Sequence, residues 1–162
     1  MKIKFILNGE NMVLNTDPAI KLSTYLKDNK IITVKRGCDH HTCTSCTVLI
    51  DDEPVLSCLT SLAQCDNSKI TTLEEFVQTK DFSDIKKGFD QAHVKMCGFC
   101  NAGKIFTAYK IIKTLNRPTK DEIRSQVSFF TCTCTETDSL VDGIYLAAAA
   151  RRSRMEKKRN EK

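Results

Sequence analysis

The first residues of the chain alternate between apolar and polar side chains, with Ile3, Phe5 and Leu7 falling on one face. A period of two predicts a β-strand with one buried face, because successive side chains of a strand point to opposite sides. The run ends at Asn8-Gly9, a pair that favours a tight hairpin turn since both turn residues need positive φ. Residues 12–14 are then the expected return strand of a β-hairpin.

Short elements continue to about residue 76. Asp17-Pro18 is typical of a helix start, because Asp caps free N–H groups and Pro suits the first helical position. Residues 47–50 and 69–73 each predict a strand, and residues 51–54 predict the turn after the first of these. This part of the sequence therefore indicates a unit that mixes strands with one or two helices.

From about residue 82 the apolar positions recur at helical spacing. The clearest stripe contains Ile105, Ala108 and Ile112, and Thr119 opens a capping box, Thr-Lys-Asp-Glu. Four helices are expected: residues 84–93, residues 101–115, one from residue 119, and residues 138–151. The predicted fold class is α+β, with a mixed domain over residues 1–78 and a helical domain over residues 82–152.

The net charge of +5 comes entirely from the end of the chain. Residues 151–162 hold seven Lys/Arg and two Glu, and the whole chain holds 25 Lys/Arg and 20 Asp/Glu, so the other 150 residues sum to zero. We expect residues 153–162 to form a basic tail without fixed structure, because chain ends fray. Contact with nucleic acid or an acidic partner is an alternative use of such a run.

No apolar run approaches the roughly 20 residues that a membrane span needs. The apolar stretch at the N-terminus is also too short for a signal peptide. These features predict a cytoplasmic protein without a membrane partner.

Nine cysteines are the most unusual feature of the composition. In a reducing cytosol metal binding is a better explanation for them than disulfides. Three fall in a C-x4-C-x2-C pattern that matches plant-type [2Fe–2S] ligation, and a fourth follows after eleven residues. Thiolates are soft ligands that suit iron. The predicted ligands of a first cluster are Cys38, Cys43, Cys46 and Cys58.

A second group consists of a C-x2-C half and a C-x-C half, separated by 31 residues. Each half directly precedes a predicted helix, so two positive helix ends are available to one anionic site. Zinc is an alternative here, because C-x2-C also suits zinc. The predicted ligands of a second cluster are Cys97, Cys100, Cys132 and Cys134.

Cys65 is the cysteine left over, and we expect a buried free thiol that packs as a small hydrophobic side chain. Cys38-Asp39-His40 resembles half of a Rieske pattern, in which two histidines replace two cysteines. The second His-bearing half is missing from the sequence. His40 and His41 are therefore expected to be exposed loop residues.

Together these motifs resemble the small iron–sulfur subunit of the molybdenum hydroxylases, the family of xanthine dehydrogenase, aldehyde oxidase and carbon monoxide dehydrogenase. The resemblance extends over residues 2 to about 150 and rests on GCDHHTCTSCTVLIDDEPVLSC, CGFCNAG and a later CTC. It implies an N-terminal β-grasp ferredoxin domain and a C-terminal four-helix domain, each holding one [2Fe–2S] cluster.

The resemblance also implies a role in electron transfer, with no catalytic residue on this chain. Single electrons would pass from a molybdopterin-binding large subunit to the helical-domain cluster and then to the N-terminal cluster. They would leave toward an FAD-binding medium subunit or another acceptor. Molybdopterin and FAD are thus expected on partner subunits, and nucleic acid is not an expected partner.

Several residues depart from the family pattern. His41 and Thr44 stand where the family usually has glycine. If φ is positive at these positions, each non-glycine residue costs about 1–2 kcal/mol of conformational energy. Met96 replaces a glutamine that normally approaches the pterin, and Thr133 replaces an arginine. We expect intact cluster ligation with altered contacts to the cofactor or the partner.

Two other functions fit part of the sequence. A free-standing ferredoxin needs only the first cluster, which would leave the helical domain unexplained. A zinc- or cluster-stabilised binding module would use the basic tail, but no aromatic residues alternate with the basic ones there, as stacking on single strands requires.

Overall fold

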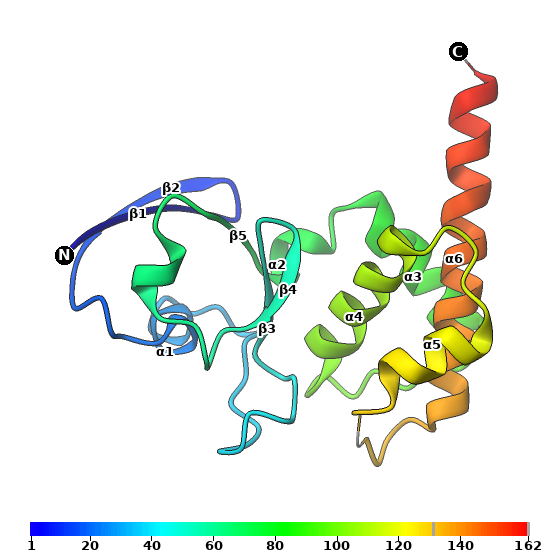
Figure 1. The fold of residues 1–162 in the computed structure, drawn as a ribbon, viewed down its shortest axis with the longest axis horizontal. Coiled ribbons are helices and arrows are strands. Elements are labelled where there is room, and N and C mark those ends of the chain that lie inside the picture. Colours follow the sequence, from blue (N-terminus) through cyan, green and yellow to red (C-terminus); the bar gives the residue numbers. More distant parts are fainter. Residues whose placement is uncertain (131, 162) are drawn as a thin grey trace. The chain divides into compact units, whose positions relative to one another are not determined.

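The computed structural model describes residues 1–130 and 132–161, which form two compact units (Figure 1). The first unit comprises Met1–Gln78 with Gly98–Phe106, and the second comprises Thr79–Cys97 with Thr107–Lys162. A mixed sheet dominates the first unit and helices form the second, so the predicted α+β class is confirmed.

A five-stranded mixed sheet forms the first unit, in the order β2-β1-β5-β3-β4. β1 and β5 run parallel, and the other neighbouring pairs are antiparallel. The strands are β1 (Lys2–Leu7), β2 (Glu10–Asn15), β3 (Thr47–Ile50), β4 (Glu53–Leu56) and β5 (Lys69–Thr71).

The predicted N-terminal hairpin is confirmed. Asn8 and Gly9 have φ values of 49° and 84°, and β1 pairs with β2 along all six residues of each strand. Ile3, Phe5 and Leu7 are buried, whereas the residues between them are exposed. The alternation in the sequence therefore determines which face of β1 joins the core.

The turn predicted over residues 51–54 is shorter than expected. Asp51 and Asp52 form it alone, with φ values of 50° and 68°, and β4 begins at Glu53. Pro54 lies inside β4, which is an edge strand of the sheet. An edge strand tolerates proline, because one of its sides pairs with no other strand and the missing N–H is not needed there.

Helix α1 (Leu22–Asp28) begins later than Asp17-Pro18 indicated. Asp17 instead accepts a hydrogen bond from the Ala19 N–H at 2.9 Å, which closes a local turn before the helix. Leu22 and Leu26 of α1 are fully buried against the sheet.

Cys65 lies at the end of the short 3-10 helix η1 (Leu62–Cys65) and is fully buried in the same core, as predicted. Burial raises the pKa of its thiol to about 11. The thiol is therefore protonated at neutral pH and packs as an apolar side chain.

The remaining elements are helices, and four of them match the four that were predicted. Thr119 caps α5 through its side chain, and Glu122 completes the predicted capping box. The helices are α2 (Leu73–Phe76), α3 (Lys80–Gln91), α4 (Asn101–Thr114), α5 (Lys120–Val127) and α6 (Thr137–Asn160).

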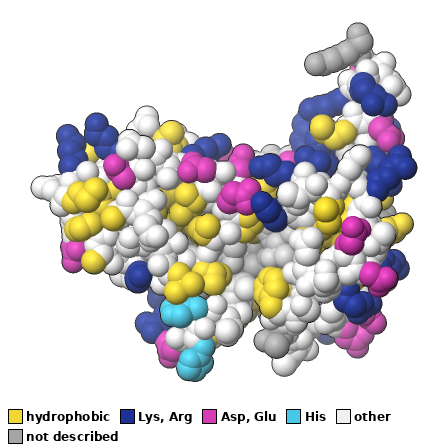
Figure 2. Space-filling model, viewed as in Figure 1, with side chains coloured by type: hydrophobic (Ala, Val, Ile, Leu, Met, Phe, Trp, Pro, Cys, Tyr) yellow, Lys and Arg dark blue, Asp and Glu magenta, His cyan; other side chains and the backbone are white. Residues whose placement is uncertain are grey.

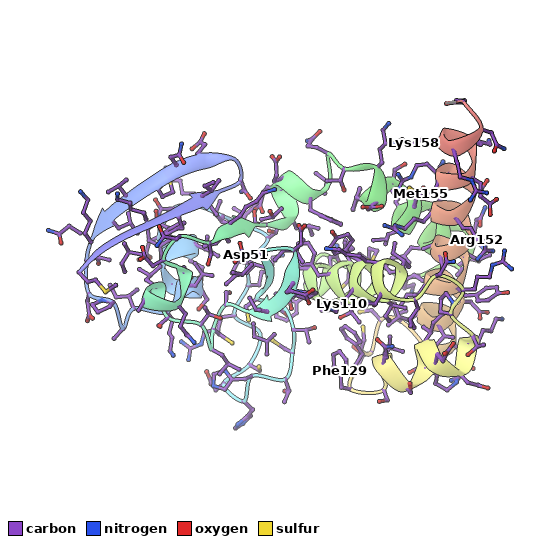
Figure 3. All side chains as sticks on the ribbon, turned by 45° about the horizontal axis from the view of Figure 1, so that its top comes forward. Asp51, Lys110, Phe129, Arg152, Met155 and Lys158 are labelled. Carbon is purple, nitrogen blue, oxygen red and sulfur yellow. The ribbon has the colours of Figure 1, made fainter. Side chains whose placement is uncertain are left out.

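Helix α6 continues to Asn160, so most of the stretch expected as a tail without fixed structure is helical. Arg151 and Arg154 of α6 form ion pairs with Asp81 and Asp84 of α3, and these pairs hold the helix beyond its apolar segment. Lys and Arg side chains gather on this end of α6 (Figure 2), where Arg152, Met155 and Lys158 project from the ribbon (Figure 3). Lys162 lies outside the described residues.

Within the described part of the chain, no helix combines the length and the apolar character that crossing a membrane requires.

Candidate iron–sulfur sites

The loop between α1 and β3 carries three of the predicted ligands of the first cluster. Hydroxyl groups brace its end: Thr47 Oγ1 donates to the Thr44 carbonyl at 2.6 Å, and Ser57 Oγ donates to the Cys46 carbonyl at 2.7 Å. The second bond also joins this loop to the segment after β4 that contains Cys58. Fully buried Ser57 therefore connects the two parts of the chain that supply cysteines.

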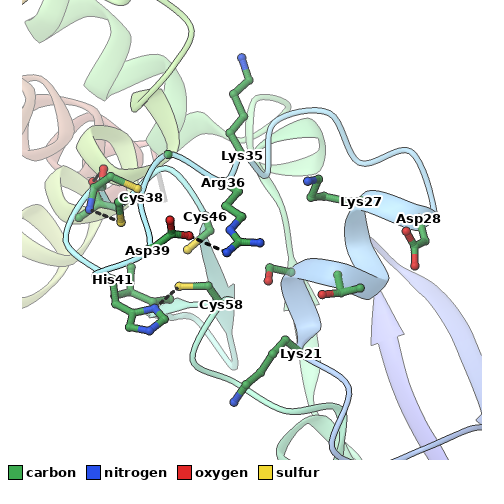
Figure 4. Close-up of a pocket in the computed structure, with 16 residues that line it drawn as sticks. Lys21, Lys27, Asp28, Lys35, Arg36, Cys38, Asp39, His41, Cys46 and Cys58 are labelled. Carbon is green, nitrogen blue, oxygen red and sulfur yellow. Dashed lines mark hydrogen bonds and ion pairs between the residues drawn. The ribbon is translucent and has the colours of Figure 1, made fainter.

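All four predicted ligands of the first cluster line one cavity of about 690 Å³ within the first unit (Figure 4). The backbone N–H groups of Thr42 and Cys43 donate to the Cys38 sulfur at 3.3 and 3.4 Å. Donors of this kind stabilise negative charge on a thiolate. The structure thus brings together cysteines that lie up to 20 positions apart in the sequence: Cys38, Cys43, Cys46 and Cys58.

The thiols in this cavity differ in acidity. Hydrogen bonds from Cys43, above all from its backbone N–H, lower the pKa of Cys38 to about 6. Burial, together with the neighbouring Cys46 and Cys38, raises the pKa of Cys58 to about 12. Cysteines bind metal as thiolates, so bound iron would require these thiols to lose their protons. The positive charge of the iron would then offset the repulsion between the negatively charged sulfurs.

The residues present fit a [2Fe–2S] cluster. Such a cluster takes four cysteines shared between two irons. Here four cysteines line one cavity, and two backbone N–H groups donate to the sulfur of one of them. Among the described residues, no three His, Cys, Asp or Glu side chains converge closely enough to hold a single metal ion.

His41 and Thr44 both adopt positive φ, at 59° and 56°, the conformation for which the family's usual glycines are suited. Thr44 packs closely against Gly103 of α4: a Cβ at Gly103 would lie 2.1 Å from Thr44 Oγ1. Glycine at position 103 is therefore needed to accommodate threonine at position 44.

His41 has a contact that the sequence did not indicate. Its side chain is exposed, as predicted, but its Nδ1 lies 3.2 Å from the Cys58 sulfur. No local pattern reveals this contact, because the two residues are 17 positions apart and meet only through the fold.

The predicted ligands of the second cluster come from two segments of the sequence, one before α4 and one before α6. Cys97 and Cys100 flank a tight turn in which Gly98 has a φ of 89° and donates its N–H to Asn101 Oδ1 at 3.1 Å. This turn leads directly into α4.

Cys132 and Cys134 precede α6 and line a cavity of about 370 Å³ in the second unit, together with Thr133. Thr135 Oγ1 donates to the Lys95 carbonyl at 2.8 Å and anchors this segment. The described residues that line this cavity do not include the other pair of cysteines. Both ligand sets stay predictions.

Comparison with known proteins gives matches over both parts of the chain. A 2Fe-2S iron-sulfur cluster binding domain matches residues 8–91, and a [2Fe-2S] binding domain matches residues 72–145.

Individual relatives match over nearly the whole chain. The nicotine 6-hydroxylase small subunit of Paenarthrobacter nicotinovorans is 32% identical, over 89% of this chain and 87% of its own. The xanthine dehydrogenase iron-sulfur-binding subunit of Escherichia coli O157:H7 is 31% identical, over 88% and 91%. A chain of quinoline 2-oxidoreductase from Pseudomonas putida 86 superposes with a TM-score of 0.80 at 35% identity, covering 94% of this chain and 96% of that one.

A ferredoxin-like sheet domain joined to a helical domain, each matching a [2Fe–2S]-binding family, defines an iron–sulfur electron-transfer protein. The chain belongs to the small iron–sulfur subunits of the xanthine dehydrogenase family of molybdenum hydroxylases. Its role in such a complex is electron transfer.

Proposed function

We propose that this chain passes single electrons from the molybdopterin of a large subunit toward an FAD subunit or another acceptor. The route comprises two [2Fe–2S] clusters, and the cavity lined by four cysteines is the observation that carries the proposal. The cysteines assigned to the first cluster are Cys38, Cys43, Cys46 and Cys58, and those assigned to the second are Cys97, Cys100, Cys132 and Cys134.

The chain's own residues prepare the first site for negative charge. When bound, a [2Fe–2S] cluster takes up and releases one electron at a time. Lys27, Lys35 and Arg36 line the cavity with the cysteines (Figure 4). Lys35 donates to the Gly98 carbonyl at 2.6 Å. Arg36 forms an exposed ion pair with Asp39 at 2.6 Å, which offsets part of its charge.

Helix ends support the assignment of the second site. Each pair of cysteines stands just before a long helix, α4 or α6, whose free N–H groups and dipole favour an anion. The same proposal includes an FAD subunit as a partner, which the family resemblance implies. It also includes a cytoplasmic location, which the sequence predicts.

Metal analysis tests the proposal directly. We expect anaerobically purified protein to contain about four irons and four sulfides per chain, with two [2Fe–2S] EPR signals after dithionite reduction. Two irons with one zinc would contradict the second half of the proposal and leave only the N-terminal cluster.

Cysteine variants assign the signals to the sites. Cys58→Ala should remove one EPR signal and about two irons, and Cys134→Ala should remove the other signal. Cys65→Ala is the matched control, because Cys65 is a buried thiol outside both ligand sets. A Cys58→Ala protein that kept both signals would refute the first ligand set.

A further inference from the structure

His41 contacts a proposed cluster ligand through a side-chain atom. Its Nδ1 lies 3.2 Å from the Cys58 sulfur, within hydrogen-bonding distance for sulfur, and both residues line the same cavity (Figure 4). The histidine comes from the loop between α1 and β3, and the cysteine comes from the segment after β4. The contact therefore depends on the tertiary fold.

The backbone at His41 makes the contact notable. It has a φ of 59°, a left-handed conformation that histidine adopts more readily than most residues other than glycine. A glycine at this position would satisfy the backbone without reaching the sulfur. The imidazole thus adds an interaction that the loop conformation does not itself require.

Iron binding would settle the direction of this hydrogen bond. A thiolate bound to iron has no proton to donate, so the hydrogen has to come from the Nδ1–H of the imidazole. Adding one electron makes a four-thiolate site more negative by one charge. A hydrogen bond to one of its sulfurs is stronger in that reduced state and therefore raises the reduction potential.

We propose that His41 donates a hydrogen bond to the Cys58 thiolate and thereby raises the reduction potential of the first cluster. This inference rests on the proposed ligation by Cys58. His41 is a tuning residue and takes no part in bond chemistry. A higher potential at the first cluster favours its acceptance of an electron from the second one.

The donor to Cys58 is a side chain and can be removed by substitution, unlike the backbone N–H groups that donate to Cys38. His41→Gly removes the imidazole and suits the positive φ. His41→Asn keeps an N–H donor, because the Asn Nδ2 and the His Nδ1 occupy equivalent positions beside Cγ, and Asn also tolerates a left-handed backbone. His40→Asn is the matched control, because it removes the neighbouring exposed histidine.

The measurement is an EPR-monitored redox titration of each purified protein, with the second cluster as internal reference. We expect His41→Gly to lower the equilibrium constant for one-electron reduction of the first cluster several-fold, and at most about tenfold, which is 59 mV for one electron. His41→Asn should recover part of this change. The potential of the second cluster should not move in any variant, and His40→Asn should match the unsubstituted protein.

Two kinds of failure can be told apart. Fewer than two [2Fe–2S] signals in the unsubstituted protein would defeat the proposed function itself. Two signals with an unchanged first potential in His41→Gly would overturn the tuning role alone. Loss of the first signal only in His41→Gly would also overturn it, because His41 would then be needed to retain the cluster.

Discussion

At the scale of single residues, identical side chains have different chemistry in this protein. Backbone and side-chain hydrogen bonds lower the pKa of Cys38 to about 6, whereas burial alone raises that of Cys65 to about 11. At neutral pH the first is a thiolate ready to bind iron and the second is an inert thiol. The pKa of a cysteine in this protein therefore follows its local hydrogen bonds and burial, and Cys58 in the cavity has a raised pKa of about 12 as well.

Glu74 is a second residue whose surroundings determine its charge. It accepts hydrogen bonds from the Thr33 N–H at 3.0 Å, the Thr33 hydroxyl at 2.6 Å and the Thr72 hydroxyl at 2.7 Å. Burial raises the pKa of this carboxyl, but these hydrogen bonds outweigh burial and hold the pKa below its ordinary value of 4.5. A carboxylate with a lowered pKa stabilises the fold above its ordinary pKa, and that contribution is lost as pH falls through the lowered value.

We therefore predict that Glu74→Gln lowers the free energy of unfolding by about 1–2 kcal/mol at pH 7. The difference from the unsubstituted protein should shrink below about pH 4.5, because protonation then removes the same charge. Denaturant unfolding at both pH values measures this, with exposed Glu75→Gln as the control. A difference in the free energy of unfolding that stayed constant with pH would contradict the stabilising role of the Glu74 carboxylate.

At the scale of elements, α3 and α6 are joined by ion pairs that include one buried carboxylate, that of Asp84. Arg154 Nε lies 2.7 Å from Asp84 Oδ2, and Arg151 Nε lies 3.1 Å from Asp81 Oδ1. Asp84 is only 3% exposed, so it depends on its partner for neutralisation. Removing one member of a buried pair leaves an uncompensated charge.

Arg154→Met should accordingly destabilise the helical unit by about 3 kcal/mol. Lys158→Met, at an exposed position on the same helix end, should change stability by less than about 0.5 kcal/mol, as for other surface substitutions. Thermal unfolding followed by circular dichroism compares the two variants. Equal effects would show that the α3–α6 pairs do not hold this part of α6.

At the scale of the whole molecule, the positive charge is concentrated on the end of α6 (Figure 2). Deleting residues 155–162 removes four Lys/Arg and two Glu but keeps both arginines that pair with α3. We predict that this truncated chain keeps its iron content, both EPR signals and its electron transfer in the assembled complex.

The same deletion tests the function as a binding module. Retention on immobilised nucleic acid should be weak and alike for both chains at 0.15 M salt, where screening reduces unspecific attraction. Strong retention that disappears with the deletion, while redox activity remains, would favour the binding module instead.

Local patterns were sufficient for much of the fold. The alternation in β1, Asn8-Gly9 and the capping box at Thr119 each produced the predicted element, because strand faces, turn φ values and helix caps depend on neighbouring residues. Asp17-Pro18 misled for the same reason: its local turn formed, but the helix began at Leu22, where side chains reach the core.

The sequence by itself determined the spacing of the cysteines, the α+β class and the family. Each of these depends on which residue types recur at which separations along the chain. Only the tertiary structure decided that His41 meets Cys58, that Thr44 needs Gly103, and that Arg154 meets Asp84. These partners are 17, 59 and 70 positions apart, and no periodic pattern relates them. Their proximity arises when buried apolar faces bring distant backbone segments together, which is a property of the packed chain.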